Sequence, residues 1–182
     1  MNNMAKRYGV FSQLNRRGIH IAMLQETRLT LQEGQALQKR WRGQLYYTSY
    51  SAYTQGILIW VKPGVLFQVT GSMADPDSRF LAVSERLTGR EITLLSVCAP
   101  NIEQGTFLGT LFNKLADFLV QPLIMGGDFN CVAEIALDHS HPPLRDSPAH
   151  TTARNFRDWK TRWDLIDIWR TLHPLERDYL FF

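Results

Sequence analysis

The chain lacks several features that mark whole classes of protein. It has only two cysteines, Cys98 and Cys131, both in apolar runs, which is typical of reduced core thiols and not of a disulfide framework. No segment approaches the roughly 20 consecutive apolar residues of a membrane span, and the first residues lack the apolar region of a secretory signal. We therefore expect a soluble, intracellular protein that does not contact membranes.

Common catalytic motifs are missing as well. The sequence contains no Gly-x-Ser-x-Gly elbow, no phosphate-binding P-loop and no dinucleotide fingerprint. Its histidines and cysteines do not have the spacing of a zinc site, and His139, His141 and His150 fall in a polar loop. These absences argue against a serine hydrolase of that type, a P-loop nucleotidase and a zinc enzyme.

The composition is that of one globular domain. The 182 residues are 45% hydrophobic and 12% aromatic, which supplies enough apolar material for a packed core. We expect a single domain over residues 1–182. The net charge of +3 permits contact with a polyanion without demanding it.

The order of elements predicts a mixed α/β fold. A short helix closed by Gly18 should precede a strand at 19–24 that is buried on both faces. A capping box at Thr30 and Glu33 predicts a helix to about residue 40, and five strands over 45–97 read as an antiparallel meander. A helix over 107–119, a strand at 123–125 and a late helix capped by Thr151 or Thr152 complete the order.

Polar side chains follow two of these strands. Glu26 comes after the strand at 19–24, whereas Asp128 and Asn130 follow the strand at 123–125 and point the same way from an extended segment. Carboxylate and amide oxygens suit Mg²⁺. Two plainer interpretations stay open: Glu26 is an exposed loop acid or a capping partner, and Asp128 and Asn130 tie down their own turn.

A set of short segments carries a family resemblance: LQET (24–27), CAPN (98–101), GGDFN (126–130), LD (137–138), DLIDIWR (164–170) and LHP (172–174). In this order and spacing, the set resembles the endonuclease/exonuclease/phosphatase family. The most similar branch is the exodeoxyribonuclease III-like, apurinic endonuclease-like domain of LINE-type non-LTR retrotransposons. The resemblance covers essentially the whole chain.

The resemblance implies a four-layered α/β sandwich, with two sheets face to face and helices outside. It also implies Mg²⁺-dependent hydrolysis of DNA phosphodiesters, with Mn²⁺ as a substitute, in a nuclear protein fused to a reverse transcriptase. By position, Glu26 matches the metal-binding glutamate and Asp128 the aspartate that orients or deprotonates water. Asn130 matches the asparagine that helps to hold the phosphate.

The chain also departs from the family pattern. The family's first asparagine ligand and its closing Ser-Asp-His fall outside residues 1–182, so we expect a domain without its first and last strands. Cys98 stands where the family has its active-site tyrosine, and Leu180 stands where retrotransposon relatives tend to have a hydroxyl residue. We therefore expect little nicking by the isolated chain.

Two alternatives to the nuclease remain. One is a catalytically inactive remnant of the domain, with at most weak DNA or metal binding. The other is a phosphomonoesterase or lipid phosphatase of the same fold, against which the retrotransposon-like segment LIDIWR (165–170) argues.

Three arginines are candidates for DNA contact. Arg40 and Arg42 flank Trp41, a combination that can hold phosphates and stack on a sugar or base. Arg154 lies on the late helix among other basic residues. The plainer interpretation is a solvated helix face.

Overall fold

The computed structural model describes most of the chain, namely residues 4–49, 55–87, 89–120, 122–141, 143–144 and 146–177. Leu180 lies outside these residues. The chain divides into two compact units, the first made of Met1–Ala99 and Leu115–Asp128 and the second of Pro100–Lys114 and Phe129–Phe182. A single domain over 1–182 stays a prediction.

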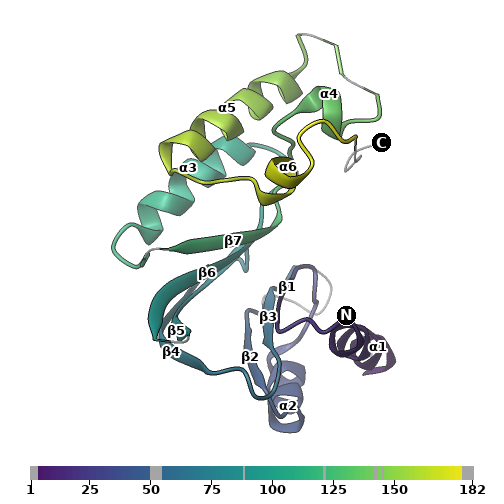
Figure 1. Cartoon of the computed structure of the whole chain (residues 1–182), viewed down its shortest axis with the longest axis vertical. Coiled ribbons are helices and arrows are strands. Elements are labelled where there is room, and N and C mark those ends of the chain that lie inside the picture. Colours follow the sequence, from purple (N-terminus) through teal and green to yellow (C-terminus); the bar gives the residue numbers. More distant parts are fainter. Residues whose placement is uncertain are drawn as a thin grey trace. The chain divides into compact units, whose positions relative to one another are not determined.

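The first unit begins with helices packed on a small sheet (Figure 1). The sheet has the order β1-β3-β2, with both pairings antiparallel. Its elements are α1 (Met4–Arg16), β1 (Ile21–Leu24), α2 (Leu31–Arg40), β2 (Gln44–Tyr47) and β3 (Leu58–Val61). The strand at 19–24 was predicted to be buried on both faces; β1 is instead half-buried and, among the described residues, lies at the edge of its sheet beside β3.

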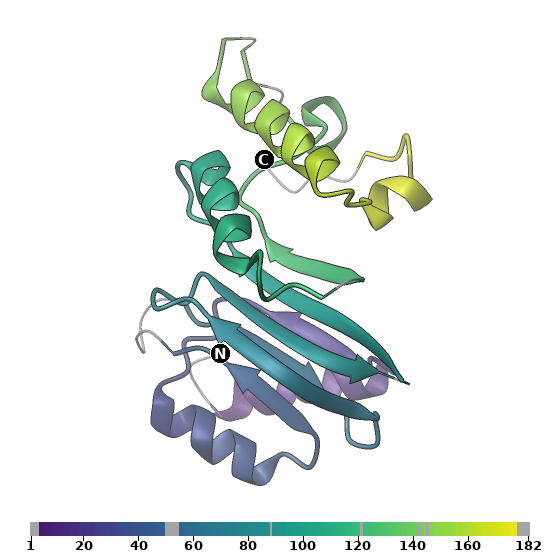
Figure 2. The same cartoon turned by 90° about the vertical axis from the view of Figure 1, so that its left-hand side faces the viewer.

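A second sheet completes this unit, and Figure 2 shows its strands side by side in teal and green. Its order is β4-β5-β6-β7, in which β6 and β7 are parallel and the other pairs antiparallel. Its strands are β4 (Phe67–Ala74), β5 (Phe80–Leu87), β6 (Arg90–Cys98) and β7 (Leu123–Asp128).

The single meander predicted over 45–97 is therefore wrong, because two of its five strands belong to the first sheet. Strand β3 explains the division, since all four of its residues are buried. Leu58 and Trp60 pack with the helices, while Ile59 and Val61 pack against the second sheet. A strand that is apolar on both faces needs a layer on each side, so the chain leaves the first sheet after Val61 and builds another.

Local signals at the helix ends are confirmed. Thr30 accepts a hydrogen bond from the backbone N–H of Glu33, and the Glu33 carboxylate accepts from the N–H of Thr30. The hydrogen bond to the Thr30 backbone and the Arg7 side chain lower the pKa of Glu33. Gly18 ends α1 with φ of 70°, a conformation in which glycine is not strained.

The second unit is helical in its described residues. Its helices are α3 (Gln104–Leu115), α4 (Ile135–Asp138), α5 (Pro148–Arg162) and α6 (Ile168–Leu172). Helix α5 starts before the predicted caps Thr151 and Thr152, because Ser147 caps it and Pro148 takes its first turn. The ring of Phe112 stacks on Trp163 with centroids 4.1 Å apart and meets Trp159 edge-on at 4.6 Å.

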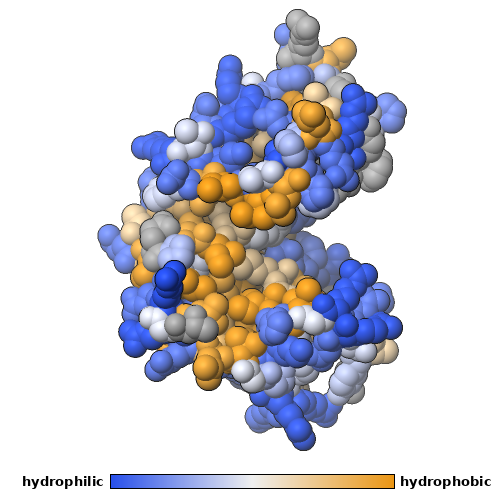
Figure 3. Space-filling view, viewed as in Figure 1, coloured by the Kyte–Doolittle hydropathy of each residue, from blue (hydrophilic) through white to orange (hydrophobic). Residues whose placement is uncertain are grey.

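The helical spacing of Trp159, Trp163 and Trp169 is typical of core residues, but this interpretation is wrong for Trp169. Its side chain is 44% exposed and stacks on His173. Other apolar side chains of the same segment are also exposed, namely Ile166, Ile168, Leu172 and Leu175. Figure 3 shows apolar patches on each of the two units. Within the described part of the chain, no helix combines the length and apolarity that a membrane crossing needs.

Candidate active site

Glu26 lies in a tightly held loop after β1. Its backbone and that of Arg28 adopt left-handed conformations, with φ of 52° and 51°, which cost about 1–2 kcal/mol each for residues with a side chain. The backbone N–H groups of Thr27 and Arg28 donate to the carbonyls of Gly56 and Gln55, at 3.0 and 2.9 Å. This pairing fixes the loop, so the carboxylate is held at the end of the strand.

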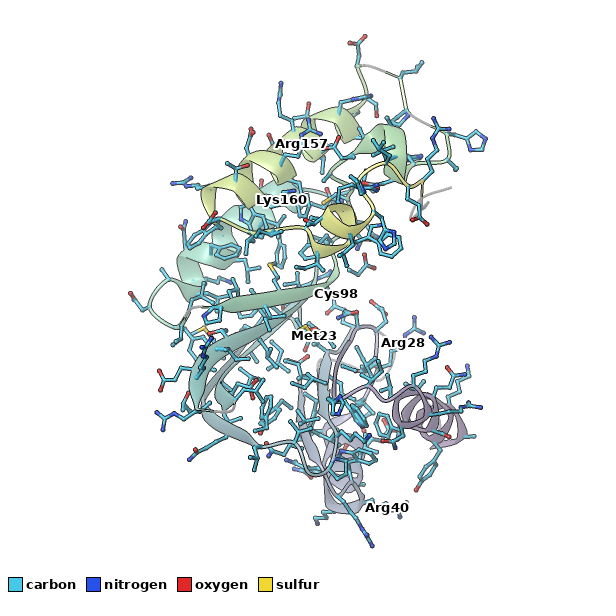
Figure 4. The ribbon with its side chains drawn as sticks, in the orientation of Figure 1. Met23, Arg28, Arg40, Cys98, Arg157 and Lys160 are labelled. Carbon is cyan, nitrogen blue, oxygen red and sulfur yellow. The ribbon has the colours of Figure 1, made fainter. Side chains whose placement is uncertain are left out.

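The Glu26 carboxylate contacts a guanidinium and a thiol. Its Oε2 lies 3.6 Å from Nε of Arg28, and both side chains are about half exposed. Its Oε1 accepts a long hydrogen bond of 3.9 Å from Sγ of Cys98. Figure 4 shows Cys98 on β6, with Met23 of β1 and Arg28 nearby at the same end of the first unit.

Cys98 is the buried neighbour of two carboxylates. It is 3% exposed, and its register partner in the parallel pair is Asp128 of β7. Burial raises the pKa of the thiol, and the negative charges of Glu26 and Asp128 raise it further, while Arg79 lowers it. The thiol is therefore neutral near pH 7 and acts as a weak hydrogen-bond donor, not as a nucleophile.

Asp128 is positioned by the backbone of the same parallel pair. Its carbonyl accepts from the N–H of Ala99 at 2.8 Å, and its side chain is exposed. The preceding Gly127 has φ of 147°, and a Cβ at this position would overlap the backbone of Val97. The glycine before Asp128 is thus required by the close approach of β7 to β6, a role that the sequence did not predict.

Glu26, Cys98 and Asp128 are thus brought to one end of the first unit. Within the described ranges, no three His, Cys, Asp or Glu residues form a ready-made metal cage. Mg²⁺ does not need one, because it keeps several waters and binds proteins through one or two carboxylates. The two exposed carboxylates fit a hydrated cation of this kind.

Asn130 belongs to the second unit, so its approach to Asp128 stays a prediction. Its backbone is left-handed, with φ of 49°, a conformation in which asparagine is enriched. Its carbonyl accepts a hydrogen bond of 3.1 Å from Nε2 of Gln104. Phe129, which lies between Asp128 and Asn130 in the sequence, packs on Phe156 with ring centroids 5.4 Å apart.

A cavity of about 400 Å³ lies beside Asn130 within the second unit. The amide side chains Asn101, Gln104 and Asn130 contribute to its wall. The rest of the lining combines apolar side chains with a carboxylate, an imidazole and a hydroxyl, namely Ile102, Cys131, Val132, Pro148 and Ala149 with Glu103, His139 and Thr152. The sequence did not predict this cavity, because its wall combines loops that are distant along the chain.

An ion pair that the sequence did not predict joins two of the family segments. The guanidinium of Arg170, in α6, binds the carboxylate of Asp138, in α4, and both side chains are largely buried. Arg170 also donates to the carbonyls of His173 and Glu176, at 2.9 and 2.7 Å. These contacts give the LD (137–138) and DLIDIWR (164–170) segments a structural role.

The predicted DNA-contact residues are exposed but are not gathered in one unit. Arg40 ends α2 and Arg42 follows it in the first unit, while Arg154 lies on α5 in the second. Trp41 is not available for base stacking, because it packs between Phe11 and Trp60 and donates to the carbonyl of Val61 at 3.0 Å. That part of the prediction is wrong.

The remaining basic residues of α5 are partly used within the fold. Figure 4 labels Arg157 and Lys160 on this helix. The guanidinium of Arg157 donates to the carbonyl of Ala133 at 2.5 Å, so this residue holds the loop after β7 and is no free phosphate ligand.

Comparison with known proteins identifies the fold. No protein-family profile matches the chain. It is 25% identical to the transposon TX1 uncharacterized 149 kDa protein of Xenopus laevis, with 94% of this chain aligned to 13% of that protein. The chain thus spans a small part of this relative.

Two solved structures show the same architecture. An AP endonuclease from Archaeoglobus fulgidus matches 95% of this chain and 71% of its own, with a TM-score of 0.69 and 19% identity. The endonuclease domain of TRAS1, a telomere-specific non-LTR retrotransposon, matches 87% and 66%, with a TM-score of 0.57 and 18% identity. The chain therefore has the endonuclease/exonuclease/phosphatase fold and resembles the apurinic endonuclease-like domain of LINE-type retrotransposons.

Proposed function

We propose that the chain is a Mg²⁺-dependent endonuclease domain of retrotransposon origin that nicks DNA by hydrolysing a phosphodiester. The observation that carries this proposal is the pair of carboxylates Glu26 and Asp128. They lie at the ends of β1 and β7, on a fold shared with an AP endonuclease and a retrotransposon endonuclease. The negative charges of Glu26 and Asp128 both raise the pKa of Cys98, which is buried in the core between the two sheets.

The residue types suit the roles that we assign. Glu26 would hold the divalent cation, Mg²⁺ or Mn²⁺, whose charge offsets the charge of the phosphate. Asp128, exposed at the end of its strand, orients the attacking water and takes its proton. Asn130 donates an amide hydrogen to a phosphate oxygen without repelling it.

Several further assignments belong to the same proposal. Arg40, Arg42 and Arg154, all exposed, contact DNA phosphates from the two units. In a longer protein the domain is fused to a reverse transcriptase and acts in the nucleus, where it leaves a primer end. The alignment of this chain with 13% of a 149 kDa transposon protein is consistent with such a fusion.

Nicking of supercoiled plasmid tests the proposal. We expect slow conversion to open circles in Mg²⁺ and none with EDTA. Asp128→Asn should abolish the reaction, because it removes the group that takes the proton. The matched control is Asp117→Asn, an exposed aspartate outside the site, which should nick like the wild type. Absence of Mg²⁺-dependent nicking, or nicking that survives in Asp128→Asn, would overturn the proposal.

A second candidate function is an inactive remnant, and the observation that favours it is Cys98. The family's tyrosine carries a hydroxyl, whereas this position holds a buried thiol that donates only weakly. The plasmid assay separates the two candidates. Hydrolysis of p-nitrophenyl phosphate without plasmid nicking would instead support the phosphomonoesterase alternative.

A further inference from the structure

Gln104, the first residue of α3, links two loops of the second unit. Its side-chain Nε2 donates to the carbonyl of Asn101 at 2.6 Å and to the carbonyl of Asn130 at 3.1 Å. A primary amide has two N–H groups, so one side chain satisfies both acceptors. Asn101 follows β6 along the chain, and Asn130 follows β7.

The environment makes this link strong. Gln104 is only 8% exposed, and water therefore competes little for its two hydrogen bonds. Without the Gln104 amide, the backbone carbonyls of Asn101 and Asn130 each lose this hydrogen bond. We call the Gln104 side chain with its two hydrogen bonds the Gln104 clamp. Its acceptors are backbone carbonyls, which a substitution does not remove, so the clamp is tested by replacing Gln104.

The backbone at Asn130 needs such support. Its φ of 49° lies in the left-handed region, which asparagine occupies more often than most residues but which is still a minor conformation for any residue with a side chain. Glu103, directly before Gln104, is also left-handed, with φ of 57°. Strained conformations of this kind persist only where surrounding contacts determine them. The Gln104 clamp is a contact of this kind, and it acts on the residue to which the proposed reaction assigns the phosphate oxygen.

We propose that Gln104 is a positioning residue that holds Asn130 in its strained conformation for contact with the scissile phosphate. This inference rests on the proposed function. The cavity of about 400 Å³ borders this clamp, because Asn101, Gln104 and Asn130 all form part of its wall. The clamp keeps that wall in one arrangement.

The test compares Gln104→Met with a matched control. Methionine has a similar length and suits a helix but donates no hydrogen bond. The control, Gln35→Met, makes the same change at an exposed position of α2. If the wild type nicks plasmid, we expect Gln104→Met to lower kcat by about tenfold or more, with KM changed by less than about twofold, because positioning is lost in the transition state.

A double-mutant cycle shows whether Gln104 acts through Asn130. In an Asn130→Ala background, Gln104→Met should cause no further loss of kcat. A full additional loss would show that Gln104 acts elsewhere and would overturn the proposal. An unchanged kcat in the single variant Gln104→Met would overturn it as well.

A structural readout keeps this inference separate from the proposed function. In Gln104→Met, the backbone amide resonances of Asn130 and Cys131 should shift or broaden, whereas in Gln35→Met they should stay in place. Unchanged resonances in Gln104→Met would refute the clamp. If the wild type shows no Mg²⁺-dependent nicking, the proposed function fails, and the resonances still decide whether the clamp exists.

Discussion

At the scale of single residues, the thiol of Cys98 most changes the chemistry expected of the site. Its pKa is raised by burial and by the charges of Glu26 and Asp128, and the residue is almost fully buried. The sequence predicted a core thiol at this position and matched it to the CAPN segment (98–101), but it did not predict the contact with Glu26, because that contact depends on how the two sheets face each other. The other cysteine, Cys131, is partly exposed.

This difference predicts unequal reactivity of the two thiols. Under native conditions near pH 7.5, Ellman's reagent should modify Cys131 at least about tenfold faster than Cys98, because the thiolate is the reactive form and burial raises the pKa of Cys98. Cys131→Ser should remove the fast phase only. In guanidinium chloride both thiols should react at similar rates, and equal rates in the native protein would contradict the burial of Cys98.

At the scale of elements, strand β5 carries an unusual core residue. Glu85 is fully buried, and among the described residues neither carboxylate oxygen has a hydrogen-bond partner. Burial raises its pKa to about 7. The neighbouring hydroxyl of Tyr46 also has a raised pKa, through burial and then through the charge of Glu85. Glu85 therefore makes the stability of the first unit depend on pH.

The direction of this pH dependence follows from the numbers of protons that the folded and unfolded states bind. Between about pH 4.5 and pH 7, folded Glu85 stays protonated while the unfolded group ionises. The folded state then binds more protons, so the free energy of unfolding falls as pH rises through this window and levels off above it. The total effect of a shift of this size is about 3 kcal/mol.

Glu85→Met should remove this loss of stability at high pH, because an apolar side chain of similar length suits the core. We expect the variant to exceed the wild type in free energy of unfolding by about 2–3 kcal/mol at pH 8 and by less at pH 5. Urea denaturation at both pH values measures this. Glu91→Met, at an exposed site in the next strand, should retain the pH dependence of the wild type. Parallel pH profiles for Glu85→Met and the wild type would refute the assignment.

The elements themselves show what local sequence can predict. The capping box at Thr30 and the helix stop at Gly18 depend on residues within one turn, and both are confirmed. The division of the strands between two sheets was not predictable in the same way. It depends on β3 being covered on both faces, which strand periodicity does not reveal when every residue is apolar.

At the scale of the whole molecule, the site residues are divided between two compact units. Glu26, Cys98 and Asp128 belong to the first, and Asn130 belongs to the second with its clamp at Gln104. Family segments in the sequence indicated Glu26, Asp128 and Asn130. The sequence did not indicate Gln104 or the pair of Asp138 and Arg170, because these contacts join segments that are far apart along the chain.

The central claim is that Glu26 holds a divalent cation at the end of the first unit where Asp128 also lies, and the loss of the Mn²⁺ electron paramagnetic resonance signal on binding tests it most directly. We predict that the wild type binds Mn²⁺ and that Glu26→Gln, which removes a charged ligand, weakens binding by about tenfold or more. The matched control Glu91→Gln, at an exposed surface pair with Arg86, should bind like the wild type. Equal Mn²⁺ affinity in the wild type and in Glu26→Gln would contradict the claim.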